Sequence, residues 1–232
     1  MLAPDPLHPL WHTPIGVHRF AEAQEVNAVL VRVFSAMRAA DQAKAGGSQS
    51  FYASADDLLN RIRLGEWDQL VRFLVDSVRQ TVVLANQGAW HEERPGFQMA
   101  LRGIWFQMSH AGSHHDVHTH GNCSWSGVYC VQVDPPEQRT AHPVLGAANG
   151  VTRFYGPHFN RLGGAAMDFG NAYLQNAHVD MAPVPGQLVV FPSWLPHQAM
   201  PYHGDAQRVI VSFNMSVHAA QGSDQLHRYA PV

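Results

Sequence analysis

The stretch "GQLVVFPSWLPHQAMPYHGDAQRVIVSFN", residues 186–214, contains two apolar runs on either side of a turn-rich segment. Both runs are short, rich in branched and aromatic residues, and bounded by Gly, Pro, Asn or Asp, which is typical of β-strands. Runs of the same kind precede them from Phe97 onward: "FQMALRGIWFQMS", "SGVYCVQVD", "VTRFY" and "HVDMAPV". We therefore predict that residues 96–218 form a mainly β core, a small sandwich or barrel, and that residues 219–232 form a tail.

Residues 1–95 have a helical pattern instead. In "FAEAQEVNAVLVRVFSAMRAADQAKAG" apolar residues recur every three or four positions, which predicts an amphipathic helix that ends at Gly46 and Gly47. A shorter helix is expected after Ser54, whose side chain can cap it. A longer helix is expected to bury Trp67, Leu70, Val71, Leu74, Val78, Val82 and Val83. We expect these helices to pack on the β core, so that residues 1–232 form a single domain.

The composition restricts the class of partner. The chain has 232 residues, of which 46% are hydrophobic, and a formal net charge of −3, so no basic field favours a nucleic acid or an anionic membrane. No apolar stretch approaches the roughly 20 residues of a membrane helix, and the first residues lack the features of a signal peptide. We expect a cytoplasmic protein with a small-molecule or amino-acid-like substrate, and a homodimer is an open possibility.

Histidine is unusually frequent, with sixteen in the chain, and this favours a metal site. In "HDVHTHG", residues 115–121, alternate side chains of a strand share one face, so His118 and His120 are expected to point the same way, together with Asp116. A third ligand has to come from a distant strand. His197 is the best candidate, because it follows the end of an apolar strand within "SWLPH". His203, in the next turn, is the substitute if His197 does not take part.

Arg208 opens the otherwise apolar strand "RVIVSFN". A buried arginine is costly unless an anion meets it, and its fork of donors suits a carboxylate. Two interpretations remain open here. Arg208 either binds an anionic ligand or pairs with Asp205 or Asp180.

Between Trp105 and Val217, the blocks "HTHGNCSWSGVYCVQVD", "VTRFYGP" and "GQLVVFPSWLPHQAMPYHGDAQRVIVSFN" resemble a family of 2-oxoglutarate and Fe(II) dependent oxygenases. The resemblance covers about half of the chain. It implies a double-stranded β-helix, or jelly-roll, with iron(II) held by His118, His120 and His197 and with Arg208 binding the far carboxylate of 2-oxoglutarate. The implied reaction is hydroxylation of an unactivated C–H bond of an unknown small molecule or side chain.

The chain departs from the wider superfamily at one ligand. That superfamily uses two histidines and a carboxylate, with His-x-Asp or His-x-Glu on the early strand, whereas this chain has His118-x-His120. Either three imidazoles hold the ion, which we favour, or Asp116 supplies a carboxylate. In the first case Asp116 can orient a ligand histidine from behind. His114 and His115 are expected at the surface or behind the ligands.

A cupin-like enzyme is the main alternative. Gly112 and His118, followed by Gly186, Pro192 and His197, have the spacing of the two cupin motifs, but the expected glutamate after His120 is missing. A cupin-like site in this chain would therefore also have three histidine ligands. It predicts a metal dioxygenase or isomerase that does not use 2-oxoglutarate. A metal-free binding module is the third possibility.

Several further residues are candidates for the pocket. Asn122 and Ser126 continue the face of His120 if the strand is regular, and Tyr129 either offers its hydroxyl to the cosubstrate or packs in the core, which we favour. Two cysteines, Cys123 and Cys130, are too few for a disulfide framework and are expected to be buried reduced thiols. The long segment from Pro135 to Gly170 is expected to carry substrate contacts: Arg153, Tyr155, His158, Asn160 and Arg161.

Overall fold

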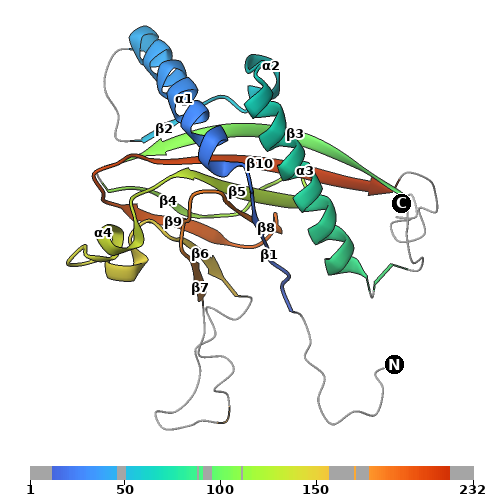
Figure 1. The fold of residues 1–232 in the computed structure, drawn as a ribbon. Coiled ribbons are helices and arrows are strands. Elements are labelled where there is room, and N and C mark those ends of the chain that lie inside the picture. Colours follow the sequence, from blue (N-terminus) through green and yellow to red (C-terminus); the bar gives the residue numbers. More distant parts are fainter. Residues whose placement is uncertain are drawn as a thin grey trace.

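The computed structural model describes residues 12–45, 51–87, 89–90, 96–110, 112–156, 170 and 178–219. Within these residues two antiparallel sheets face each other (Figure 1). The larger sheet consists, in spatial order, of β1 (Gly16–Arg19), β8 (Gln187–Pro192), β5 (Trp125–Gln132), β10 (Arg208–Ala219), β3 (Phe97–Ser109) and β2 (Phe51–Ala53). The smaller sheet consists of β4 (Ser113–His118), β9 (His197–Tyr202), β6 (Thr152–Tyr155) and β7 (His178–Met181). This arrangement is a double-stranded β-helix, as predicted.

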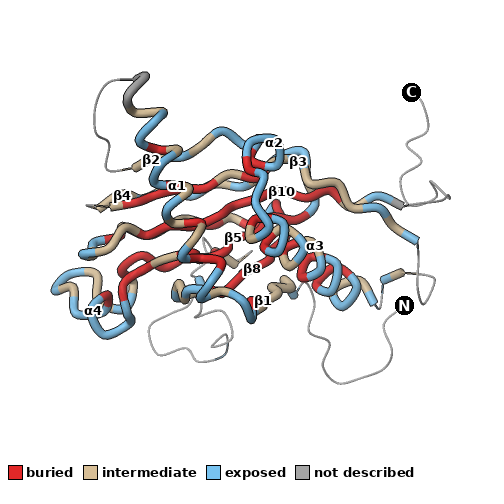
Figure 2. The backbone as a smooth tube through the Cα atoms, turned by 45° about the horizontal axis from the view of Figure 1, so that its top comes forward, coloured by how far each residue is buried: buried red, intermediate tan, exposed pale blue. Residues whose placement is uncertain are grey.

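Two long helices cover the outer face of the larger sheet (Figure 1). These are α1 (Ala23–Ala45) and α3 (Gly65–Asn86), and the short α2 (Leu58–Arg61) lies between them in sequence. Alternate residues of the sheet pack against these helices. For example, Phe106 of β3 stacks on Phe34 of α1, with ring centroids 4.3 Å apart. Figure 2 shows the buried backbone running through β10, β5 and β8 beneath the helices. One hydrophobic cluster therefore includes residues of both the helices and the sheet.

The first half of the chain also contributes strands that the sequence did not reveal. β1 pairs with β8 and β2 pairs with β3, so both lie at the edges of the larger sheet. With four and three residues, these strands are too short for an alternating pattern to stand out. The other short elements are α4 (Pro136–Thr140) and a 3₁₀ turn (Gly146–Ala148), both between β5 and β6.

Two helix details differ from expectation. Ser54 does not cap α2, because its hydroxyl accepts a hydrogen bond from the Phe106 amide at 3.1 Å and α2 starts only at Leu58. Val83 is 39% exposed, and Thr81 is buried on the covered face of α3. Thr81 is tolerated there because its hydroxyl bonds to the carbonyl of Ser77 and to the ring of His18.

The remaining observations concern strand β9 and the thiols. "HQAMPY" was not expected to be a strand, because a proline interrupts it and no clear alternation appears.

Cys123 and Cys130 are free, the first half-buried and the second buried. Among the described residues, no helix combines the length and the apolar character needed to cross a bilayer.

Candidate active site

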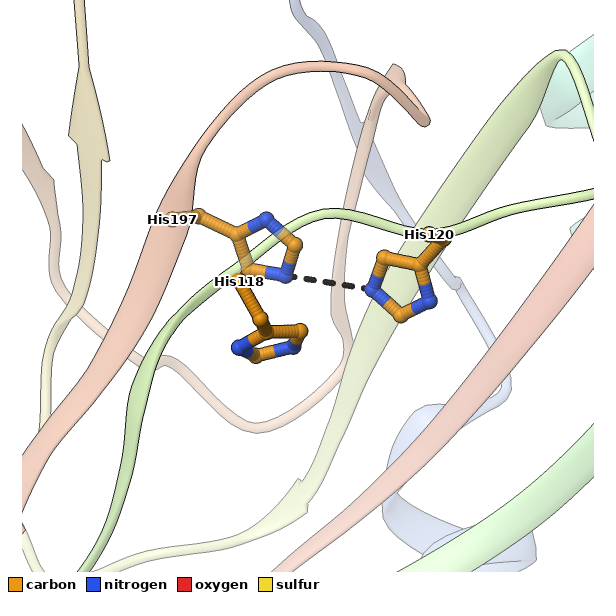
Figure 3. A group of neighbouring side chains, drawn as sticks. All are labelled: His118, His120 and His197. Atoms are coloured by element: carbon orange, nitrogen blue, oxygen red, sulfur yellow. Dashed lines mark hydrogen bonds between the residues drawn. The ribbon is translucent and has the colours of Figure 1, made fainter.

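Three imidazoles meet between the two sheets (Figure 3). His118 ends β4 and His197 begins β9, and the two are direct partners across these strands. His120 follows two residues after β4. The ligand atoms of the three rings lie within 4.8 Å of one another, and the Nε2 atoms of His120 and His197 are 3.2 Å apart. Two nitrogens bound to one ion at about 2.1 Å and at a right angle lie about 3 Å apart, so the separation between His120 and His197 fits a single cation.

Main-chain carbonyls orient two of the rings. His118 donates from Nδ1 to the carbonyl of Asp116 at 2.7 Å, and His197 donates from Nδ1 to the carbonyl of Leu195 at 2.9 Å. A ring that donates from Nδ1 has its lone pair on Nε2, the atom that a metal binds. Burial lowers the pKa of both His120 and His197 to about 4, so these two rings are neutral at pH 7. His120 and His197 can therefore bind a cation without first releasing protons.

A bulge in β4 places Asp116 outside the site. His115 pairs with Ala199 and His118 pairs with His197, so three steps along β4 correspond to two along β9. His115 and His118 consequently both line the cavity, while the Asp116 side chain is 97% exposed and lies 3.8 Å from the ring of His114. The structure does not bring this carboxylate to the three imidazoles. Asp116 holds His118 through its main chain.

We expect Asp116→Ala to leave the affinity for iron(II) within about twofold of the wild-type value, because the substitution retains the carbonyl that holds His118. Anaerobic competition against a chelator measures this affinity. A tenfold loss would instead show that the carboxylate is a ligand or orients one.

Arg208 lies in the wall of a cavity of about 250 Å³ next to the three histidines. Its side chain is 3% exposed, Nε has no hydrogen-bond partner, and no ion pair of Arg208 occurs in the part of the chain that the structure describes. Burial lowers the pKa of the guanidinium. Asp180 pairs with Arg153 at 2.7 Å, and Asp205 accepts a hydrogen bond from Gln138, so neither of the two candidate partners meets Arg208. A buried cation with no counter-ion in a cavity wall is suited to an anionic ligand.

Three other candidates lie away from the cavity. Tyr129 is fully buried on the opposite face of the sheet, where its hydroxyl donates to Asn27 Oδ1 at 2.8 Å. Ser126 bonds to the hydroxyl of Ser193 and to the side chain of Asn214. Asn122 is exposed in a turn with φ of 56°. The alternation of side chains along β5 explains why Tyr129 points away from the cavity, since every second residue of that strand faces the helices.

We therefore expect Tyr129→Phe to lower the free energy of unfolding by about 1 kcal/mol, the net contribution of one buried hydrogen bond. Chemical denaturation measures this loss. The dissociation constant of 2-oxoglutarate is expected to stay unchanged, and a clear increase would place the hydroxyl in the cosubstrate site after all.

The cavity includes residues that the sequence did not single out. It is lined by Trp105, Gln107, His115, His118, His120, Gly127, Val128, Thr152, Phe191, His197, Ala199, Arg208, Ile210 and Ser212. Ile210 and Ser212 could have been found from Arg208 by alternation along β10. His115 could not, because the bulge in β4 reverses the face on which it lies.

The residues between Pro135 and Gly170 that were expected to contact a substrate do not line the cavity where the structure describes them. Arg153 forms an ion pair with Asp180, and the Tyr155 hydroxyl bonds to Gln198, on the face of the smaller sheet opposite to Thr152. His158, Asn160 and Arg161 lie outside the described residues. His203 is exposed and packs on His142, with ring centroids 4.8 Å apart, so it does not replace His197.

Comparisons with known proteins agree with this fold. Residues 103–214 match the family described as "Putative 2OG-Fe(II) oxygenase". A search of curated proteins finds no significant match. AviO1 from Streptomyces viridochromogenes aligns over 91% of this chain and 92% of its own, with 12% identity and a TM-score of 0.51. The non-heme α-ketoglutarate dependent epimerase SnoN of nogalamycin biosynthesis aligns over 95% and 88%, with 15% identity and a TM-score of 0.50. At these identities the likeness establishes the fold.

Proposed function

From the match of residues 103–214 we propose that the chain belongs to the 2OG-Fe(II) oxygenase family, that His118, His120 and His197 hold iron(II), and that Arg208 binds 2-oxoglutarate. The chain is thus an oxygenase that uses iron and 2-oxoglutarate. The finer proposal is hydroxylation of an unactivated C–H bond. The observation that carries it is the combination, in one cavity, of three converging imidazoles and a buried guanidinium that no acid of the described residues pairs with.

The donor set fits both groups. Imidazole nitrogen is a common ligand of iron, and three ligands on one side leave positions for a chelating keto acid and for dioxygen. The guanidinium of Arg208 suits a carboxylate, with which it can form two parallel charge-assisted hydrogen bonds. When bound, iron and 2-oxoglutarate supply the oxidising chemistry, in which dioxygen, 2-oxoglutarate and substrate become succinate, carbon dioxide and hydroxylated product.

The protein's own residues prepare this chemistry. The carbonyls of Asp116 and Leu195 fix two ligand rings, and Arg208 fixes the far end of the cosubstrate. Phe191 packs against His197, with ring centroids 4.6 Å apart, and limits the access of water to the ligand side. A cupin-like enzyme without 2-oxoglutarate would leave the charge of Arg208 without a partner, so we place it second.

Anaerobic titration of the metal-free protein tests the proposal. Iron(II) followed by 2-oxoglutarate is expected to give a visible charge-transfer band, together with one succinate per turnover once oxygen and substrate are present. If iron binds and 2-oxoglutarate produces no band, the cupin-like alternative gains support. If neither binds, the protein is a metal-free binding module.

His115 is a further candidate for contact with the cosubstrate. It lines the same cavity wall as His118 and belongs to the preceding residue pair between β4 and β9, His115 with Ala199. Its ring centroid is 5.8 Å from that of His118. Burial, the charge of His118 and that of Arg208 lower the pKa of His115, which keeps its ring neutral with an N–H to donate. We expect His115→Phe to raise the dissociation constant of 2-oxoglutarate about fivefold, which corresponds to one hydrogen bond of about 1 kcal/mol. The charge-transfer band measures this, and an unchanged constant would remove His115 from the cosubstrate site.

A further inference from the structure

The ligand set leaves the loaded cavity with an excess of positive charge. We propose that, with iron(II) and 2-oxoglutarate bound, the cavity takes one further anion, carried by the substrate or free in solution. This inference rests on the proposed function. It concerns what the His118, His120 and His197 site binds beyond its two cofactors.

The excess follows from the charges of the residues. Three neutral imidazoles leave iron(II) its full charge of two, which the dianion 2-oxoglutarate balances, so that the buried guanidinium of Arg208 leaves a charge of plus one. A site with a carboxylate in place of His120 would be neutral. A buried charge without a partner is unfavourable, and a bound anion removes that cost.

No acid side chain offsets the excess within the described residues. Neither aspartate nor glutamate is among the residues that line the cavity. The Asp116 carboxylate is turned to solvent. Asp134 accepts the hydroxyl hydrogen of Tyr202, and Asp180 pairs with Arg153. No acid in the part of the chain that the structure describes therefore offsets the excess charge, and an anion from solution can meet it.

The wall facing the imidazoles offers neutral donors. Trp105 of β3 and Ser212 of β10 are direct partners across their strands, and both line the cavity. The Trp105 ring lies 6.3 Å from the His120 ring, centroid to centroid. An indole N–H and a hydroxyl on this side can donate to an anion and add no negative charge that would repel it.

The test uses the protein loaded with cobalt(II) and 2-oxoglutarate, because the visible bands of cobalt respond to a change of ligand. Azide is the anionic probe, and the matched variant is His120→Asp, which restores the carboxylate. Azide is expected to bind the wild-type protein at least tenfold more tightly than the variant. Equal affinities, or a flat titration of the loaded wild-type protein, would overturn the inference. If cobalt or 2-oxoglutarate does not bind the wild-type protein, the proposed function itself fails.

A second measurement does not depend on the variant. In the wild-type protein azide is compared with imidazole, a neutral ligand, and an anion preference of at least tenfold supports the inference, whereas equal binding contradicts it. Acetate and acetamide distinguish the two possible sources of the anion, which are an acid group of the substrate and a free ion in solution. If acetate displaces azide and acetamide does not, an acid group on a substrate is accepted. If azide binds and acetate does not displace it, the anion is a small free one.

Discussion

Arg208→Met is expected to weaken 2-oxoglutarate binding by at least about 100-fold, close to 3 kcal/mol, while iron(II) binds as before. The side chain is buried, no acid of the described residues pairs with it, and it lies in the cavity wall rather than among the ligand atoms. Its loss therefore removes the countercharge of the cosubstrate and leaves the metal ligands in place. Anaerobic titration followed by the charge-transfer band gives both affinities.

The stability of the metal-free protein provides a second check on the same variant. Methionine replaces a buried cation, for which the described residues supply no ion-pair partner, by an apolar side chain of similar length. The free energy of unfolding is therefore expected to stay the same or to rise. Arg153→Met is the control, because Arg153 is paired with Asp180 on the outer face and should leave 2-oxoglutarate binding unchanged. Equal binding in wild-type protein and Arg208→Met would show that another group holds the cosubstrate.

His197→Ala is expected to abolish detectable turnover and to reduce the affinity for iron(II) by at least about 100-fold, since it removes one of three ligands. The rise in melting temperature that iron produces should disappear, because stabilisation by a ligand depends on its affinity. Thermal unfolding with and without the metal measures this effect. It does not require a known substrate.

His203→Ala is the matched control for that variant. His203 follows the same strand, is exposed, and contacts His142 rather than the site. Its loss should leave the metal-dependent rise in melting temperature intact. If His203→Ala removed the rise and His197→Ala did not, the metal would lie outside the cluster of His118, His120 and His197.

The sequence predicted the fold because the strands of the core other than β4 and β9 contain compact apolar or aromatic runs. It predicted the association of His118, His120 and His197 because the family pattern is specific at those positions. It failed where a single irregularity decides the outcome. The bulge in β4 exchanges the faces of His115 and Asp116, and no residue in that stretch marks it. The hydrogen bond of Tyr129 shows a different limit, because the sequence does not reveal that its partner, Asn27, comes from a helix about a hundred residues earlier in the chain.

Because of the bulge in β4, the charge of the cavity depends on the register of β4 against β9. If the first half of β4 slipped by one residue against β9, an aspartate would replace His115 at the wall and the same amino acids would enclose a site with one more negative charge. Gly112 helps to prevent this slip, because its amide bonds to the Tyr202 carbonyl at 2.9 Å and its φ of 83° favours glycine. A side chain there would also meet the ring of His203 at 2.9 Å. One small residue at the start of a strand thus helps to decide which ions the interior accepts.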